Sequence, residues 1–126
     1  MHKTIIYTAA APEPIGPYSQ AILIEHTLYV SGQVPINAET GKLIQGSIVE
    51  ETTQVMQNLH AILKQANMDF SDVVKCAIFV KDLSHFTTIN EVYGRYFTTN
   101  PPARETVEVS RLPKDVNVEI SCIAVK

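Results

Sequence analysis

The stretch SIVEETTQVMQNLHAILKQANMDFSDVVKCAIFVK (47–81) decides the fold class, because it places a whole helix directly before a whole strand. Ser47 and Glu50 form an S-x-x-E capping box, in which each side chain can satisfy a backbone N–H at a helix start. Apolar residues then recur at helical spacing as far as Asn67, which tolerates the left-handed conformation of a C-terminal cap. The spacing predicts an amphipathic helix of about five turns. Its apolar face carries Ile48, Val55, Leu59, Ile62, Leu63 and Ala66, and its other faces carry Glu51, Gln54, Asn58 and Gln65.

The segment VVKCAIFVK (73–81) is rich in β-branched residues and almost continuously apolar. Such a run is typical of a central strand that is covered on both faces, which is our prediction for this segment. Cys76 and Cys122 both fall at apolar strand positions, so we interpret them as core thiols and not as nucleophiles.

Upstream, Pro12, Pro14, Gly16 and Pro17 predict a loop over residues 11–17. Residues 20–31 contain two short apolar runs joined at Glu25-His26, which indicates a hairpin. The segment 37–41 has turn composition and predicts a second, small hairpin between residues 34–36 and 42–44.

Downstream, Ser84 is a candidate cap for a second helix that Asn100-Pro101-Pro102 stops. Its apolar stripe consists of Phe86, Ile89, Tyr93, Tyr96 and Phe97. Two strands, 104–110 and 116–125, then flank a turn at 112–115. The chain is therefore expected to form one domain (1–126) of the α+β class, a mixed six-stranded sheet with two helices on one face. The other face needs a cover, and subunit association is the natural one.

Composition limits the possible functions. The formal net charge is −3, and the ten Lys and Arg residues form no stripe, which argues against nucleic acid as a partner. Two cysteines cannot build a disulfide framework, and four scattered histidines show no metal-ligand spacing. No segment has the length and hydropathy of a signal peptide or a membrane span. We expect a cytoplasmic protein without a metal site.

Polar residues of the last two strands are candidates for chemistry. Period-two alternation puts Arg104, Thr106, Glu108 and Ser110 on one face of their strand, and Asn117, Glu119 and Ser121 on the polar face of the next. We expect these strands to be adjacent and antiparallel, with a register that the sequence leaves open. Arg104 could bind a carboxylate through its planar fork of donors, and Glu119 could act as a general base. The alternative is a surface ion pair that contributes little.

Three further positions have two interpretations each. Tyr18 could line a pocket or anchor the core. The Ser31-Gly32-Gln33 turn could bring backbone groups close to a ligand or form a bulge. Asn90 could contact a ligand or lie on the surface. His60 has no nucleophile to pair with, so a hydrolytic triad is not supported.

At these residues the chain resembles the Rid family, also called the YjgF/RidA family of reactive-intermediate deaminases. The resemblance runs nearly end to end. It rests on IGPYSQA (15–21), SGQVP (31–35), VKCAIFVKDL (74–83), INEVYGRYF (89–97), PPARETVEV (101–109) and RLPKDVNVEISCIAV (111–125).

This resemblance implies a chorismate-mutase-like fold, a homotrimer with clefts between subunits, and hydrolysis of 2-iminobutanoate and 2-iminopropanoate to 2-oxo acids and ammonia. It further implies that Arg104 binds the substrate carboxylate and that Glu119 activates the attacking water. Gly32 would offer a backbone group to the imine nitrogen, and Tyr18, Ser31 and Asn90 would line the cleft. No cofactor is implied, since pyridoxal phosphate belongs to the enzyme that generates the imine.

The chain departs from the family at one cleft position. Many deaminase-type members read PARSCVEV where this chain has PARETVEV, so Thr106 takes the place of a cysteine and Glu105 that of a small residue. Thr106 shares the face of Arg104 and Glu105 points the other way. Two other functions remain as alternatives, a non-catalytic trimer that binds a small carboxylate, and an endoribonuclease or translation inhibitor.

Overall fold

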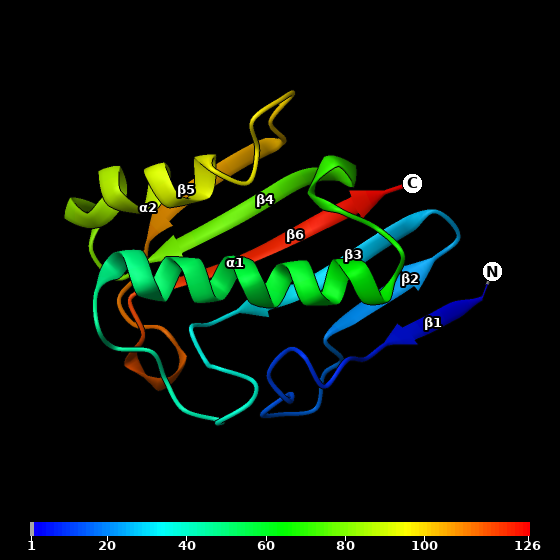
Figure 1. The fold of residues 1–126 in the computed structure, drawn as a ribbon, viewed down its shortest axis with the longest axis horizontal. Helices are drawn as coiled ribbons and strands as arrows, with labels where there is room; N and C mark the ends of the chain where they lie inside the picture. The colour runs from blue at the N-terminus through cyan, green and yellow to red at the C-terminus, as the bar shows by residue number, and fades with distance from the viewer. Residues whose placement is uncertain (1) are drawn as a thin grey trace.

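The structure, a computed structural model, describes residues 2–126. Within that range six strands form one sheet in the order β1-β2-β3-β6-β4-β5 (Figure 1). Neighbouring strands are antiparallel except β4 and β5, which are parallel. The strands are β1 (Lys3–Ile6), β2 (Ala21–Ile24), β3 (Thr27–Gln33), β4 (Val73–Val80), β5 (Ala103–Glu108) and β6 (Val118–Val125), and the helices are α1 (Ile48–Gln65) and α2 (Phe86–Gly94). The expected mixed six-stranded α+β sheet is confirmed.

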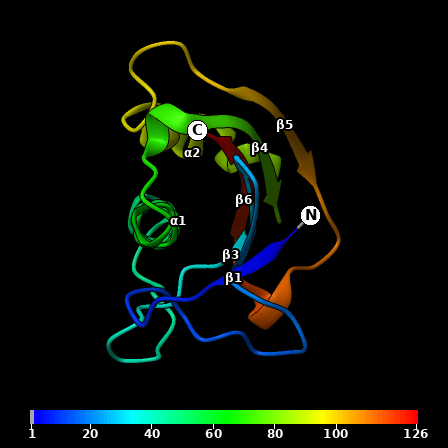
Figure 2. The ribbon, with the colours of Figure 1, turned by 90° about the vertical axis from the view of Figure 1, so that its right-hand side faces the viewer.

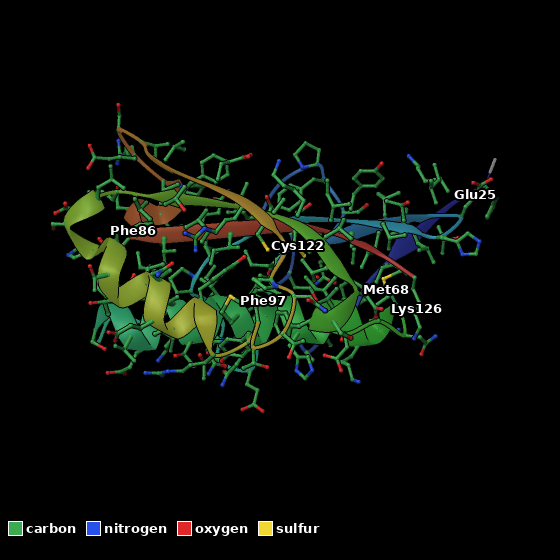
Figure 3. The ribbon with its side chains drawn as sticks, turned by 90° about the horizontal axis from the view of Figure 1, so that it is seen from above. Glu25, Met68, Phe86, Phe97, Cys122 and Lys126 are labelled. Carbon is green, nitrogen blue, oxygen red and sulfur yellow. The ribbon has the colours of Figure 1, made fainter. Side chains whose placement is uncertain are left out.

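Both helices lie on the same side of the curved sheet, as expected (Figure 2). The core fills the space between the two layers, because alternate strand residues such as Val30, Ile78 and Ile120 face α1 and are buried. Cys122 lies in this space too (Figure 3) and Cys76 is equally buried, so both cysteines are core thiols, as predicted.

Local capping signals define the long helix. The Ser47 hydroxyl accepts a hydrogen bond from the Glu50 amide at 3.1 Å. The Glu50 carboxylate contacts that hydroxyl at 3.4 Å instead of the Ser47 amide, so half of the predicted capping box forms. The helix ends at Gln65, and Asn67 has a φ of 59°, as its left-handed cap requires.

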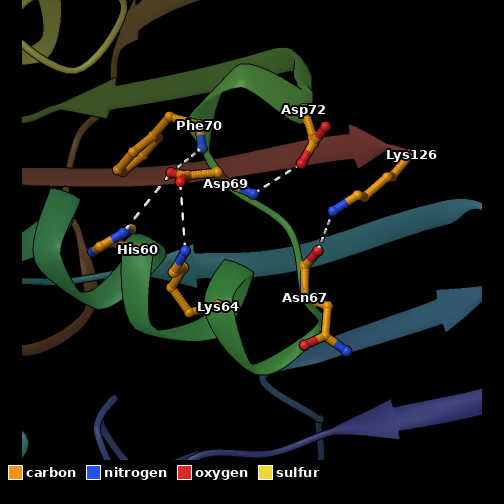
Figure 4. Close-up of polar contacts among 7 residues, drawn as sticks. All are labelled: His60, Lys64, Asn67, Asp69, Phe70, Asp72 and Lys126. Atoms are coloured by element: carbon orange, nitrogen blue, oxygen red, sulfur yellow. Dashed lines mark hydrogen bonds and ion pairs between the residues drawn. The ribbon is translucent and has the colours of Figure 1, made fainter.

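Asp69 stabilises the turn that leads from α1 into β4 (Figure 4). Its carboxylate accepts from the Phe70 amide at 2.8 Å and lies 3.5 Å from the Lys64 ammonium and 3.8 Å from the His60 imidazole. The Phe70 hydrogen bond, with a smaller effect from Lys64, lowers the pKa of Asp69. A short 3-10 turn (Phe70–Asp72) follows, so the chain enters β4 at a fixed angle.

The expected small hairpin forms in minimal form, because segments 34–36 and 42–44 share one antiparallel bridge, Ile36 with Leu43, flanked by two backbone hydrogen bonds. It stays outside the six-stranded sheet, whose edge strand β1 was not predicted. The expected cap and end of the second helix are wrong, since this helix ends at Gly94, well before Asn100. The second helix starts at Phe86 behind a 3-10 turn capped by Asp82, because the Asp82 carboxylate accepts from the Ser84 amide.

β4 is covered on one face only. Its residues alternate between buried and half-buried positions, because neither helix reaches the second face of the sheet. On that second face Tyr29 is 51% exposed, and Ile5 and Val107 are also exposed.

Candidate active site

The first candidate pocket is a cavity of about 350 Å³ at the end of β3, on the sheet face away from the helices. A bulge in β3 creates it, because Val30 pairs with Cys122 and Gln33 with Ile120, which leaves one extra residue in β3. The bulge was one of the two interpretations of the Ser31-Gly32 turn. The pocket is lined by Ile15, Tyr18, Ser31, Gly32, Val34, Pro113 and Glu119.

Glu119 lies directly against the bulge. A Cβ atom on Gly32 would come within 2.8 Å of the Glu119 carboxylate carbon and closer still to its Oε2, so only glycine leaves room for this side chain. Burial raises the pKa of Glu119 above the ordinary glutamate value. A partly desolvated carboxylate in a pocket accepts a proton more readily than a fully solvated one.

Three buried polar side chains hold the segments that line this pocket, and the sequence patterns did not identify them as buried. They are Gln20, Glu51 and Asn58. Gln20 is 2% exposed; its amide accepts from the Thr8 amide at 2.8 Å and donates to the carbonyls of Thr8 and Pro12 at 3.0 and 2.9 Å. This fixes the segment that leads to Ile15 and Tyr18. Ser31 helps, because its hydroxyl donates to the Ser19 carbonyl at 2.6 Å.

Two side chains of α1 hold the other two segments, around Val34 and around Asn117. Asn58 donates to the carbonyls of Val34 and Ile36 at 3.1 and 3.0 Å. The Glu51 carboxylate accepts from the Asn117 side chain at 2.8 Å, next to the turn that carries Pro113. The prediction that Glu51 and Asn58 lie away from the apolar face is therefore wrong, since both are buried.

The second candidate site lies on the opposite face, between β5 and α2. Arg104 donates through Nη1 to the Asn90 Oδ1 at 2.7 Å. Its guanidinium carbon lies 5.0 Å from the centre of the Tyr93 ring and 5.6 Å from that of Phe86. The amide and the two rings hold the guanidinium in place, and its remaining donors can form a fork for a carboxylate.

Thr106 shares this face with Arg104, as predicted. Its buried hydroxyl has no hydrogen-bond partner within residues 2–126. Glu105 points to the opposite face, also as predicted, and its carboxylate pairs with the Lys75 ammonium at 3.0 Å.

Arg104 and Glu119 are not neighbours, contrary to the expected hairpin. β4 separates β5 from β6, because β5 pairs in parallel with β4 after the α2 crossover. The two side chains also lie on opposite faces, since Arg104 contacts α2 whereas Glu119 lies between Val118 and Ile120, which are buried under the helices. One chain therefore carries two separate candidate sites, which we call the Glu119 half and the Arg104 half. The first holds Tyr18, Ser31, Gly32 and Glu119, and the second holds Asn90, Arg104 and Thr106.

Other kinds of site are not evident. Residues 2–126 contain no group of three or more His, Cys, Asp or Glu side chains arranged to hold a metal ion. Over the same residues, neither helix combines the length and the hydropathy needed to cross a membrane.

The fold is therefore a small α+β domain with a glutamate at a strand bulge and an arginine held against a helix. The family model described as "Endoribonuclease L-PSP" matches residues 8–126, and the chain belongs to this family, the YjgF/Rid family. It is 51% identical to a RutC family protein of Pyrococcus abyssi, over all of this chain and 99% of the relative.

Two further relatives come from distant organisms. The human 2-iminobutanoate/2-iminopropanoate deaminase is 43% identical over 98% of this chain and 90% of the relative. The solved structure of the Rid family protein YyfA from Yersinia pestis superimposes with a TM-score of 0.96, at 46% identity over 99% of this chain and all of that one.

Proposed function

We propose that this protein is a single Rid-type domain that hydrolyses 2-iminobutanoate and 2-iminopropanoate to the corresponding 2-oxo acids and ammonia. The observation that carries the proposal is the half-buried Glu119 carboxylate, with its raised pKa, packed against the Gly32 backbone in an open pocket. The name of the human relative supports the same reaction.

The chemistry suits these residues. Arg104 binds the substrate carboxylate and Glu119 holds the water that attacks the imine carbon, taking one of its protons. The backbone of Gly32 contacts the imine nitrogen, Tyr18 and Ser31 close the pocket, and Asn90 and Thr106 complete the arginine side. Glu119 returns this proton to the nitrogen of the carbinolamine and takes the hydroxyl proton as the C=O bond forms, so that the C–N bond breaks and ammonia leaves. A protonated imine is already electrophilic, so orientation and a placed water supply most of the catalysis.

A complete site needs a second copy of the chain, because one copy places Arg104 and Glu119 on opposite faces of its sheet. We propose a homotrimer of the chorismate-mutase-like type, in which the uncovered sheet faces meet and the Arg104 half of one protomer meets the Glu119 half of the next. The exposed apolar side chains of that face, such as Tyr29 and Val107, support association.

The test is an assay in which a threonine dehydratase or an amino-acid oxidase generates the imine in situ. Added protein should speed the appearance of ammonia and 2-oxobutanoate. The Arg104→Ala variant should lose this effect while it keeps the oligomeric state seen by light scattering. Unchanged activity in that variant would refute the role of Arg104.

The family description makes endoribonuclease activity the second candidate. RNA binding normally draws on a surplus of cationic residues, and the net charge here is −3. RNA cleavage that survives purification and vanishes in the Glu119→Gln variant would favour it. Binding of 2-oxobutanoate without imine turnover would instead favour a regulatory trimer.

A further inference from the structure

The two cysteines occupy directly opposite positions on neighbouring antiparallel strands. Cys76 of β4 is the register partner of Cys122 of β6, and both are free thiols. They are 1% and 4% exposed, on the face covered by the helices. No role in the proposed reaction requires either of them.

The register determines the kind of pair they form. The Lys81 amide donates to the Asn117 carbonyl at 3.1 Å, and these two residues continue the same register, so they are a hydrogen-bonded pair. Hydrogen-bonded and non-hydrogen-bonded pairs alternate along an antiparallel ladder, so Cys76 and Cys122 are a non-hydrogen-bonded pair. Such pairs have Cα atoms about 4.5 Å apart and side chains in close approach. That separation lies inside the range of about 4.4–6.8 Å over which disulfides form.

The same row of the sheet leads to the proposed carboxylate site. Cys76 is also the register partner of Arg104 on its other side. Tyr93 of α2 lies over this row, since its ring contacts the Arg104 guanidinium and its pKa is raised by burial and then by the Cys76 thiol. The Tyr93 hydroxyl is buried and has no hydrogen-bond partner within residues 2–126. Oxidation of the Cys76 sulfur therefore changes the surroundings of the Tyr93 ring, which contacts the Arg104 guanidinium.

We propose that Cys76 and Cys122 are an oxidative modification site, which a peroxide converts to an intramolecular disulfide beside Arg104 in the same row of the sheet. The Cys76 sulfur attacks the peroxide, the O–O bond breaks, and Cys76 becomes a sulfenic acid as water leaves. The Cys122 sulfur then displaces that hydroxyl as a second water, and the S–S bond forms. A dithiol reductant returns both thiols.

Cys76 is the residue that reacts first. Burial raises the pKa of both thiols, but the neighbouring Tyr93 hydroxyl and the charge of Arg104 partly offset this effect at Cys76. At Cys122 the effect of burial is larger and the neighbouring Cys76 adds to it. Since the thiolate is the reactive form, oxidation is slow and begins at Cys76.

The experiment exposes the folded, reduced protein to hydrogen peroxide without denaturant and then measures its intact mass and its free thiols in detergent. The expected product has lost two hydrogens and both free thiols, runs as a monomer on a denaturing non-reducing gel, and is restored by dithiothreitol. Two persistent thiols, products that gain oxygen only, or disulfide-linked dimers would each overturn the proposal.

Two variants check the geometry. Cys76→Ser leaves Cys122 alone, and its mass should not fall. In the double variant Cys76→Ser/Ile78→Cys the new thiol lies diagonal to Cys122, at about 7–8 Å. This exceeds the limit of about 7 Å for a bridge. We expect no loss of two hydrogens there; an equally rapid disulfide would show that the register does not matter.

A second experiment measures the KM for the imine in the reduced and the oxidised protein, and it rests on the proposed function. The oxidised wild type should differ from the reduced form by at least about three-fold in KM, and the KM of Cys76→Ser should not respond to peroxide. An unchanged KM in fully bridged protein refutes the link to Arg104. An inactive reduced protein refutes the proposed function, and the mass result still decides the disulfide.

Discussion

Replacing Gly32 by alanine tests the closest approach in the proposed site. The added Cβ would lie 2.8 Å from the Glu119 Cδ and 3.0 Å from its Cγ, whereas ordinary contacts begin near 3.4 Å. The backbone at Gly32 has no positive φ, so alanine introduces no backbone strain and the clash is the main effect. The Glu119 side chain can relieve it by turning toward solvent, since it is only half-buried.

The carboxylate must retreat by roughly 1 Å, and a displacement of this size costs on the order of 100-fold in rate. We expect kcat in the coupled imine assay to fall by about that factor, or about 2.7 kcal/mol of transition-state stabilisation. Gly94→Ala is the matched control, because a Cβ there meets nothing within 4 Å, and it should keep full activity. Gly32→Ala with wild-type kcat would refute the placement of Glu119.

Three other perturbations follow from the contacts. Arg104→Lys loses the bidentate fork and its stacking on Tyr93, so kcat/KM should fall by about 10- to 100-fold, and a smaller change in steady-state kinetics would contradict that role. Because the pKa of Glu119 is raised, its contribution to stability is present below the unfolded pKa of about 4.3 and is lost as the pH rises through the folded pKa. Glu119→Gln should therefore raise the Tm at neutral pH and not at about pH 4; an equal rise at both would count against desolvation as the cause. Gln20→Glu would place a carboxylate against the Thr8 and Pro12 carbonyls, which accept hydrogen bonds from the Gln20 amide. Chemical denaturation should show a free energy of unfolding lower by at least about 2 kcal/mol, and a decrease under about 0.5 kcal/mol would contradict this reasoning.

Local sequence patterns identified the elements well where the interactions are local. The helix over residues 48–65 was predictable because its cap and its apolar stripe lie within the segment itself. The glycine at position 32 marked the bulge, because only a residue without a side chain fits beneath Glu119. The faces of Arg104, Glu105 and Thr106 followed from alternation along one regular strand.

Long-range pairings were not predictable in the same way. Two consecutive strands joined by a short turn normally pair, yet β6 enters the sheet between β3 and β4 because β5 already occupies the outer edge of β4. The buried polar residues were missed for a similar reason. Asn58 and Glu51 have partners 24 and 66 residues away, so nothing in their own segment distinguishes them from exposed polar residues.

Alternation assigned the side chains of the last two strands to faces, but it did not show which strands are neighbours. The sequence predicted Arg104 and Glu119 on adjacent antiparallel strands with the register left open, whereas the structure places β4 between these strands and the two side chains on opposite faces. The sequence suggested an oligomer only as a cover for apolar surface. With the two side chains on opposite faces, the proposed reaction also requires the oligomer.

Mixing two inactive variants tests this central claim most directly. Arg104→Ala keeps an intact Glu119 half, and Glu119→Gln keeps an intact Arg104 half. If each site combines halves from two protomers, random reassembly of equal amounts should restore about one quarter of wild-type activity. Each variant reassembled alone should remain inactive in the same imine assay. Recovery near one quarter is the result we predict, and no recovery in a mixture proven to contain mixed oligomers would contradict the account.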